Sequence, residues 1–173
     1  MQYAIRRART KAVRAIRALI DANAASGRLL NKATVTLYED IQEFWVACDS
    51  NGRDGRVVAC GALHVMWEDL AEIRTIAVED GHQGHGVGHL LVGELLATAR
   101  QLGVSRVFVL TFAVPFFARH GFEEIKGEAA TPEVYAELLR SYDEGVAEFL
   151  DLDRVKPNTL GNTRMLLRLT GPR

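Results

Sequence analysis

A glycine-rich loop between an expected strand and an expected helix constrains the fold of this chain most. The loop spans residues 83–88 (QGHGVG) and has three glycines at alternate positions. The apolar run 71–78 (AEIRTIAV) precedes it, and residues 90–103 follow with apolar side chains at helical spacing and a final glycine. A strand, a loop and a helix in this order, with further strands on both sides, predict an α/β layout with a mixed sheet.

The same loop predicts a binding site for an anion. Glycine permits backbone conformations that other residues avoid and lets a ligand approach closely. The first N–H groups of a helix are unpaired, and its dipole places partial positive charge there, so a phosphate or diphosphate is favoured. The alternative is a glycine-rich turn without a ligand. A dinucleotide fingerprint would need glycine where this chain has His89, and the chain contains no Gly-Lys-Ser/Thr run typical of a P-loop.

The remaining elements follow from periodicity and turn residues. Further strands are expected over residues 2–7, 42–49, 56–67, 106–110 and 164–169. Further helices are expected from Lys11 with Thr10 as the cap, within 28–40, and over 115–120 and 132–141. No repeat or linker interrupts the sequence, so one domain over residues 1–173 is expected.

Composition and charge exclude several classes of protein. A chain of 173 residues with a net charge of −1 has little long-range attraction for nucleic acid or a membrane, so neither partner is expected. Its two cysteines, Cys48 and Cys60, lie in apolar runs and are expected to be buried thiols in a reduced, cytoplasmic protein. His82, His85 and His89 form a histidine cluster without an evident third ligand of fixed geometry, so no metal is expected.

Two motifs carry a resemblance to a known family. The spacing Gln83-x-x-Gly86-x-Gly88 resembles the acetyl-CoA pyrophosphate loop (Q/R-x-x-G-x-G/A) of the GNAT acetyltransferase superfamily. FFARHGF (116–122) is similar to the family's F-Y-x-x-x-G-F segment. The resemblance implies the GNAT fold, a mixed central sheet of about six or seven strands flanked by helices. It also implies that acetyl-CoA lies in the splay between the two central strands.

A closer resemblance is to the acetyltransferase domain of amino-acid N-acetyltransferases, the N-acetylglutamate synthases. It rests on AEIRTIAV, SRVFVLT, FFARHGF and GNTRMLLRL. It implies acetylation of the α-amino group of L-glutamate, or of a close amino acid such as L-glutamine, as the first step of arginine biosynthesis. The best-known members also carry an amino-acid-kinase-like domain, and we expect a stand-alone form without it. A homodimer is compatible with the resemblance.

The resemblance assigns acetyl-CoA binding to the end of the strand and to the loop. The residues are Ile76, Ala77, Val78, Gln83, Gly84, His85, Gly86, Val87, Gly88 and His89. A backbone N–H near Ile76 would polarise the thioester carbonyl, and Val78 would hold the pantetheine. The loop N–H groups would bind the pyrophosphate.

The chemistry needs a base, because an α-ammonium group has a pKa of about 8. Glu72 matches a position where the family often places one; the alternative is a structural ion pair with Arg74. Many family members have a tyrosine proton donor where this chain has Phe117. Thr111 or a water is therefore the expected donor, with Tyr135 and Tyr142 as further options.

An acidic substrate also needs cationic side chains for its carboxylates. The candidates are Arg74, Lys156 and Arg164, with Asn158 and Asn162 as polar helpers; the loop 155–164 can equally be an ordinary connector.

Two other functions stay open. One is a GNAT enzyme for another small amine or a protein N-terminus, and the other is a non-catalytic acyl-CoA-binding sensor.

Overall fold

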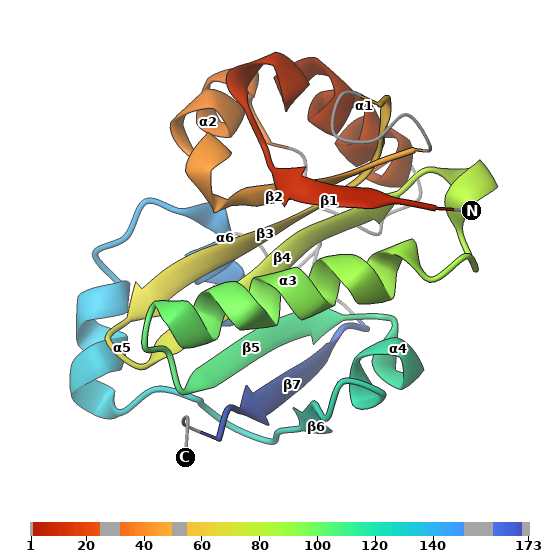
Figure 1. Ribbon diagram of the computed structural model, residues 1–173. Coiled ribbons are helices and arrows are strands. Elements are labelled where there is room, and N and C mark those ends of the chain that lie inside the picture. Colours follow the sequence, from red (N-terminus) through yellow and green to blue (C-terminus); the bar gives the residue numbers. More distant parts are fainter. Residues whose placement is uncertain (1, 25–31, 50–54, 151–160, 171–173) are drawn as a thin grey trace. The chain divides into compact units, whose positions relative to one another are not determined.

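A computed structural model describes residues 2–24, 32–49, 55–150 and 161–170. They form two compact units, Met1–Leu63 with Thr75–Thr98 and His64–Arg74 with Ala99–Arg173, and each is described by itself. The sheet has seven strands, whose hydrogen-bonded neighbours follow the order β1-β2-β3-β4-β5-β7-β6 (Figure 1). The strands β3 and β4 and the helix α3 continue from one unit into the other.

The elements lie close to the expected ranges. The strands are β1 (Ala4–Arg7), β2 (Phe44–Cys48), β3 (Val57–Trp67), β4 (Leu70–Val78), β5 (Arg106–Thr111), β6 (Glu123–Glu124) and β7 (Thr163–Arg168). The α-helices are α1 (Val13–Ala24), α2 (Thr34–Glu39), α3 (Val87–Gln101), α4 (Val114–Ala118), α5 (Pro132–Leu138) and α6 (Glu144–Phe149). Short 3-10 helices are η1 (Thr10–Ala12), η2 (Ile41–Glu43) and η4 (Asp80–His82).

In the first unit, helices cover both faces of an antiparallel sheet. Strand β2 pairs with β1 and with β3. Phe44 and Val46 of β2 pack with α1 and α2, whereas Ala47 packs with the start of α3. Successive side chains of a strand point to opposite faces. Helices α1 and α2 therefore cover one face of this part of the sheet, and α3 covers the other (Figure 1).

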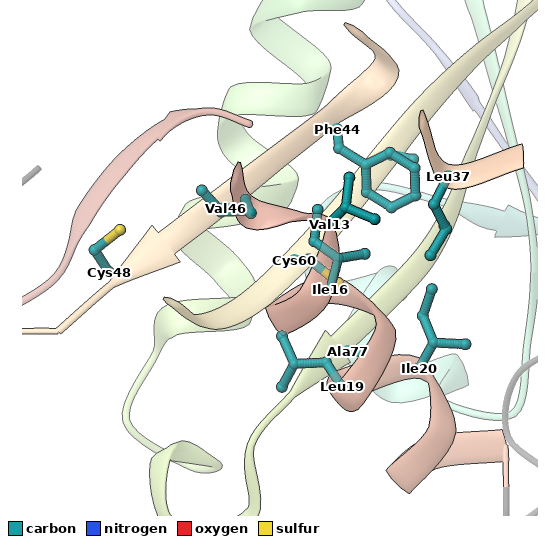
Figure 2. Packing of buried hydrophobic residues seen from close by; sticks show 12 residues of the cluster. Val13, Ile16, Leu19, Ile20, Leu37, Phe44, Val46, Cys48, Cys60 and Ala77 are labelled. Atoms are coloured by element: carbon teal, nitrogen blue, oxygen red, sulfur yellow. The ribbon is translucent and has the colours of Figure 1, made fainter. Parts of the chain in front are cut away.

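Figure 2 shows the apolar cluster beneath α1. Val13, Ile16 and Ile20 of the helix are at most 1% exposed, at the three- and four-residue spacing that predicts this helix. Each such side chain contributes about 1.5–3 kcal/mol to stability through its burial. The expectation that Thr10 caps the helix is wrong, because the 3-10 turn η1 begins at Thr10 and Arg9 occupies the cap position without a side-chain hydrogen bond.

Both cysteines are buried free thiols, as expected.

Gly61 of β3 allows side chains of β4 and α3 to pack close to the backbone of β3 inside the same unit. A Cβ atom at Gly61 would lie 2.5 Å from Ile76 Cδ1 and 3.1 Å from Leu95 Cδ1. A larger residue at position 61 would therefore require these two side chains to shift.

In the second unit, β5 pairs parallel with β4 from Leu70 to Glu72 and antiparallel with β7 along its whole length. This combination confirms the expected mixed sheet. A second apolar cluster joins these strands to α5 and α6, and Phe108 and Phe149 meet edge to face in it at 4.9 Å. The sequence did not predict β6, because a strand of two residues is too short to show a period, and it did not predict α6.

Among the helices that the structure describes, none has the length and apolar character needed to cross a membrane.

Candidate active site

The loop between β4 and α3 has the backbone geometry expected of an anion site. Gly84 and Gly86 have φ of 76° and 81°, a region that favours glycine. A Cβ atom at either position would meet no heavy atom within 4 Å, so the space beside both residues is open. Helix α3 begins directly afterwards, at Val87, and presents its first N–H groups at this end.

Polar side chains of the loop contact the loop itself and the residues just before it. Gln83 Nε2 donates to Val78 O at 3.3 Å and to Asp80 Oδ1 at 2.9 Å. His85 Nδ1 lies 2.9 Å from Gln83 O. The structure therefore places Gln83 and His85 at the start of the loop, where their roles toward a ligand stay predictions.

A charged network anchors the segment that enters the loop. Arg56 Nη1 and Nη2 lie 2.6 and 2.8 Å from the two carboxylate oxygens of Glu79. His82 Nε2 lies 3.4 Å from Glu79 Oε2, and its Nδ1 lies 3.1 Å from Tyr3 Oη. Hydrogen bonds from Arg56 hold the pKa of the Glu79 carboxyl below its usual value. Sequence reasoning missed this network, because its members come from three separate segments.

The strand before the loop contains an irregular residue. Thr75 has φ of 60°, which is rare for a β-branched residue. Its carbonyl accepts the thiol of Cys60 at 3.7 Å, and burial raises the pKa of that thiol to about 12. Ile76 packs against Gly61, and Ala77 lies in the cluster beneath α1.

In the second unit, Glu72, Arg74 and Asp143 form a charged cluster that is largely buried. Glu72 is 2% exposed, and its Oε2 lies 3.9 Å from Arg74 Nη1. Arg74 also holds Asp143 in a two-point contact, with Nη1–Oδ1 at 2.5 Å and Nη2–Oδ2 at 3.2 Å. Glu72 and Arg74 thus form the ion pair that is the alternative reading of Glu72, and Asp143 is a partner that the sequence did not reveal.

The proton-donor candidates differ in their surroundings. Thr111 is buried, and its Oγ1 accepts from Ala113 N at 2.9 Å. A hydroxyl can accept and donate together, so this bond leaves its proton available. Tyr135 donates to Leu150 O at 3.4 Å, and Tyr142 is 98% exposed. Phe117 packs edge to face against Phe116 and Phe122, as a core aromatic side chain does.

Of the other substrate candidates, Arg164 has the most contacts. Its Nη1 donates to Phe149 O at 2.8 Å, and its guanidinium lies 5.0 Å from the ring centre of Phe108. It borders a cavity of about 290 Å³, together with Gly127, Glu128, Tyr135, Phe149 and Leu150. Asn162 lies just before β7. Lys156 and Asn158 lie outside the described residues.

Within the described ranges, no group of three or more His, Cys, Asp or Glu side chains is placed to hold a metal ion.

Comparison with known proteins gives close relatives. The model of the acetyltransferase (GNAT) family matches residues 24–122. An amino-acid acetyltransferase of Mycobacterium tuberculosis is 60% identical over 165 residues, which cover 95% of this chain and 94% of that protein. An amino-acid acetyltransferase of Neisseria meningitidis serogroup B is 33% identical over 139 residues, covering 79% of this chain and 31% of that longer protein.

Two solved structures share the fold. Rv2747 from Mycobacterium tuberculosis, in complex with CoA and NLQ, has a TM-score of 0.92 and 59% identity, over 96% of this chain and 99% of that chain. N-acetylglutamate synthase from Neisseria gonorrhoeae, complexed with coenzyme A and N-acetyl-glutamate, has a TM-score of 0.75 and 24% identity, over 98% of this chain and 36% of that chain. The second likeness is one of fold alone.

Proposed function

Because the chain belongs to the GNAT family of acetyltransferases, we propose that it transfers the acetyl group of acetyl-CoA to the α-amino group of L-glutamate or of a close amino acid such as L-glutamine. It is an amino-acid N-acetyltransferase of the N-acetylglutamate synthase type. Its product would be the first intermediate of arginine biosynthesis.

The observation that carries this proposal is the loop at the start of α3. Gly84 and Gly86 hold it in a conformation with open space beside them, directly before a helix of 15 residues. Such a helix start binds a diphosphate through its backbone N–H groups. The related Rv2747 was solved with CoA, which supports the same ligand here.

The base would be Glu72. It removes a proton from the α-ammonium group, directly or through a water, and the neutral nitrogen then attacks the thioester carbonyl carbon. A C–N bond forms, the C–S bond breaks, and the nitrogen loses a second proton, which replaces the one that the thiolate takes from its donor. The backbone N–H of Ile76 would polarise the carbonyl, and the departing thiolate would take a proton from Thr111 or a water.

The carboxylates of the amino acid would bind to the cations proposed for them. Arg164 lies at the start of β7, Asn162 lies just before it, and Lys156 is six residues earlier in the sequence. Arg74 lies beside Glu72, and a substrate carboxylate there would share its guanidinium with Asp143. We therefore expect Arg74 to attract the substrate carboxylate mainly through its charge.

An acceptor screen tests the function. The protein, acetyl-CoA and each of the amino acids in turn would be mixed, with release of the CoA thiol measured and the product identified by mass spectrometry. We expect release with glutamate or glutamine above the rate without acceptor. Binding of acetyl-CoA without release for any amino acid would instead identify a sensor, and release only with another amine would identify a different acetyltransferase.

The Arg56–Glu79 contact gives a prediction about the loop. Arg56→Met should raise KM for acetyl-CoA about two- to five-fold and leave KM for the amino acid nearly unchanged, because it frees the end of β4 from which the loop starts. Glu79→Gln should act alike, and the double variant should be no worse than either single one. Arg9→Met, at another exposed arginine of the same unit, is the control. Additive effects of the two substitutions would contradict a role for their contact.

Three other expectations stay proposals. A cytoplasmic location is supported by the two buried free thiols. A single domain without a kinase-like partner, and a homodimer, await measurement of the protein's mass in solution.

A further inference from the structure

The charged cluster of Glu72, Arg74 and Asp143 contains one cation between two carboxylates. We propose that Asp143 is a positioning residue that acts on Glu72 through the guanidinium of Arg74, setting the charge that Glu72 experiences and hence its strength as a base. Because Glu72 is the base only under the proposed function, this role of Asp143 rests on that function.

The guanidinium has a fixed place. Its side chain is 8% exposed, and both terminal nitrogens contact the Asp143 carboxylate. Asp143 Oδ1 also accepts Val146 N at 2.9 Å, so the start of α6 fixes the carboxylate as well. A two-point contact between a guanidinium and a carboxylate determines the orientation of both groups.

Gly145 indicates how tightly the cluster is built. A Cβ atom there would lie 2.1 Å from Arg74 Nη1 and 3.0 Å from Asp143 Oδ1. The Arg74 guanidinium therefore occupies the space that a side chain at position 145 would need. The backbone at Gly145 has no positive φ that would by itself favour glycine. The backbone of α6 and the side chain of Arg74 fit together at this point.

The charges in the cluster depend on one another. Burial raises the pKa of Asp143, but the hydrogen bonds and the charge of Arg74 outweigh burial and lower the value to about 2. Asp143 is thus ionised throughout the usual assay range, and it offsets part of the Arg74 charge. The charged or titratable groups that the contacts identify here are Glu72 and Arg74 on β4, Asp143 before α6, and His64 on β3, which acts on Asp143 through its charge.

Removing Asp143 and removing Arg74 should therefore shift the pKa of Glu72 in opposite directions. Without the Asp143 charge, the whole Arg74 charge acts on Glu72, stabilises its ionised form and lowers its pKa. Without Arg74, a buried Glu72 loses its neighbouring cation, and its pKa rises. A merely structural role of Asp143 would not give shifts of opposite sign.

The test is the pH profile of kcat/KM for the amino acid at saturating acetyl-CoA. The limb that belongs to Glu72 is the one lost in Glu72→Gln. We expect Asp143→Asn to move this limb to lower pH by about one unit, and Arg74→Met to move it to higher pH by a similar amount. Gly145→Ala, which keeps all charges but displaces the guanidinium, should move it in the same direction as Arg74→Met.

Glu144→Gln is the matched control, because it removes a negative charge from the exposed neighbour of Asp143. Its limb should stay at the wild-type pH. Thermal unfolding and acetyl-CoA binding would show that each variant is folded, and Asn at position 143 can still accept the Val146 N–H. A limb that does not move in Asp143→Asn, or that moves equally in Glu144→Gln, overturns the role of Asp143. Wild-type turnover in Glu72→Gln would instead overturn the proposed base.

Discussion

Glu72→Gln is expected to lower kcat at least about 100-fold, while the affinity for acetyl-CoA stays nearly unchanged. The amide has almost the same size as the carboxylate but cannot accept the proton of the ammonium group. The acetyl-CoA loop lies beyond the end of β4 and begins at Gln83, eleven positions along the chain from Glu72, so its backbone N–H groups keep their arrangement. The measurement is steady-state release of CoA, together with a binding titration of acetyl-CoA.

The fold should tolerate this change. Arg74 keeps its two-point contact with Asp143 when the Glu72 charge is removed, so no guanidinium is left buried without a carboxylate. Glu68→Gln, at an exposed carboxylate in the turn between β3 and β4, is the control and should have wild-type turnover. Unaltered kcat in a folded Glu72→Gln variant would remove Glu72 from the mechanism.

The framework of the fold could be predicted from local patterns. Apolar residues at three- and four-residue spacing predict α1, because Val13, Ile16 and Ile20 must all face one core. The nearly all-apolar run 106–110 predicts a central strand. The prediction is confirmed, because β5 has hydrogen-bonded neighbours on both sides. The loop glycines predict a special backbone conformation, and two of them have positive φ.

The contacts that organise the candidate site could not be predicted in this way. Arg56 is 23 residues from Glu79 and Arg74 is 69 residues from Asp143, so no local period relates them. No turn in the sequence explains the glycine at position 145. Its role becomes clear only in the structure, where the Arg74 guanidinium lies beside it. Thr75 is harder still, because a β-branched residue within an apolar run predicts regular strand geometry.

Replacement of both positive-φ glycines, Gly84→Ala with Gly86→Ala, is expected to raise KM for acetyl-CoA about 100-fold. A residue with a Cβ atom in this backbone region costs about 1–2 kcal/mol, and 1.4 kcal/mol corresponds to a factor of ten in affinity. The loop would relax to another conformation that turns its N–H groups away from the diphosphate. Because the loop is exposed and neither Cβ atom would meet a neighbour, the thermal unfolding midpoint should change little.

KM for acetyl-CoA and kcat then separate the effect on binding from the effect on the chemical step. Each single substitution should raise KM for acetyl-CoA about tenfold, and kcat at saturating acetyl-CoA should stay within about two-fold of wild type, because Glu72 and its partners are unchanged. Gly81→Ala is the control in the same segment, since Gly81 does not have a positive φ and has open space around it. If the double variant binds acetyl-CoA as tightly as Gly81→Ala does, the diphosphate is held elsewhere, because a site formed by these N–H groups cannot survive the loss of the conformation that directs them.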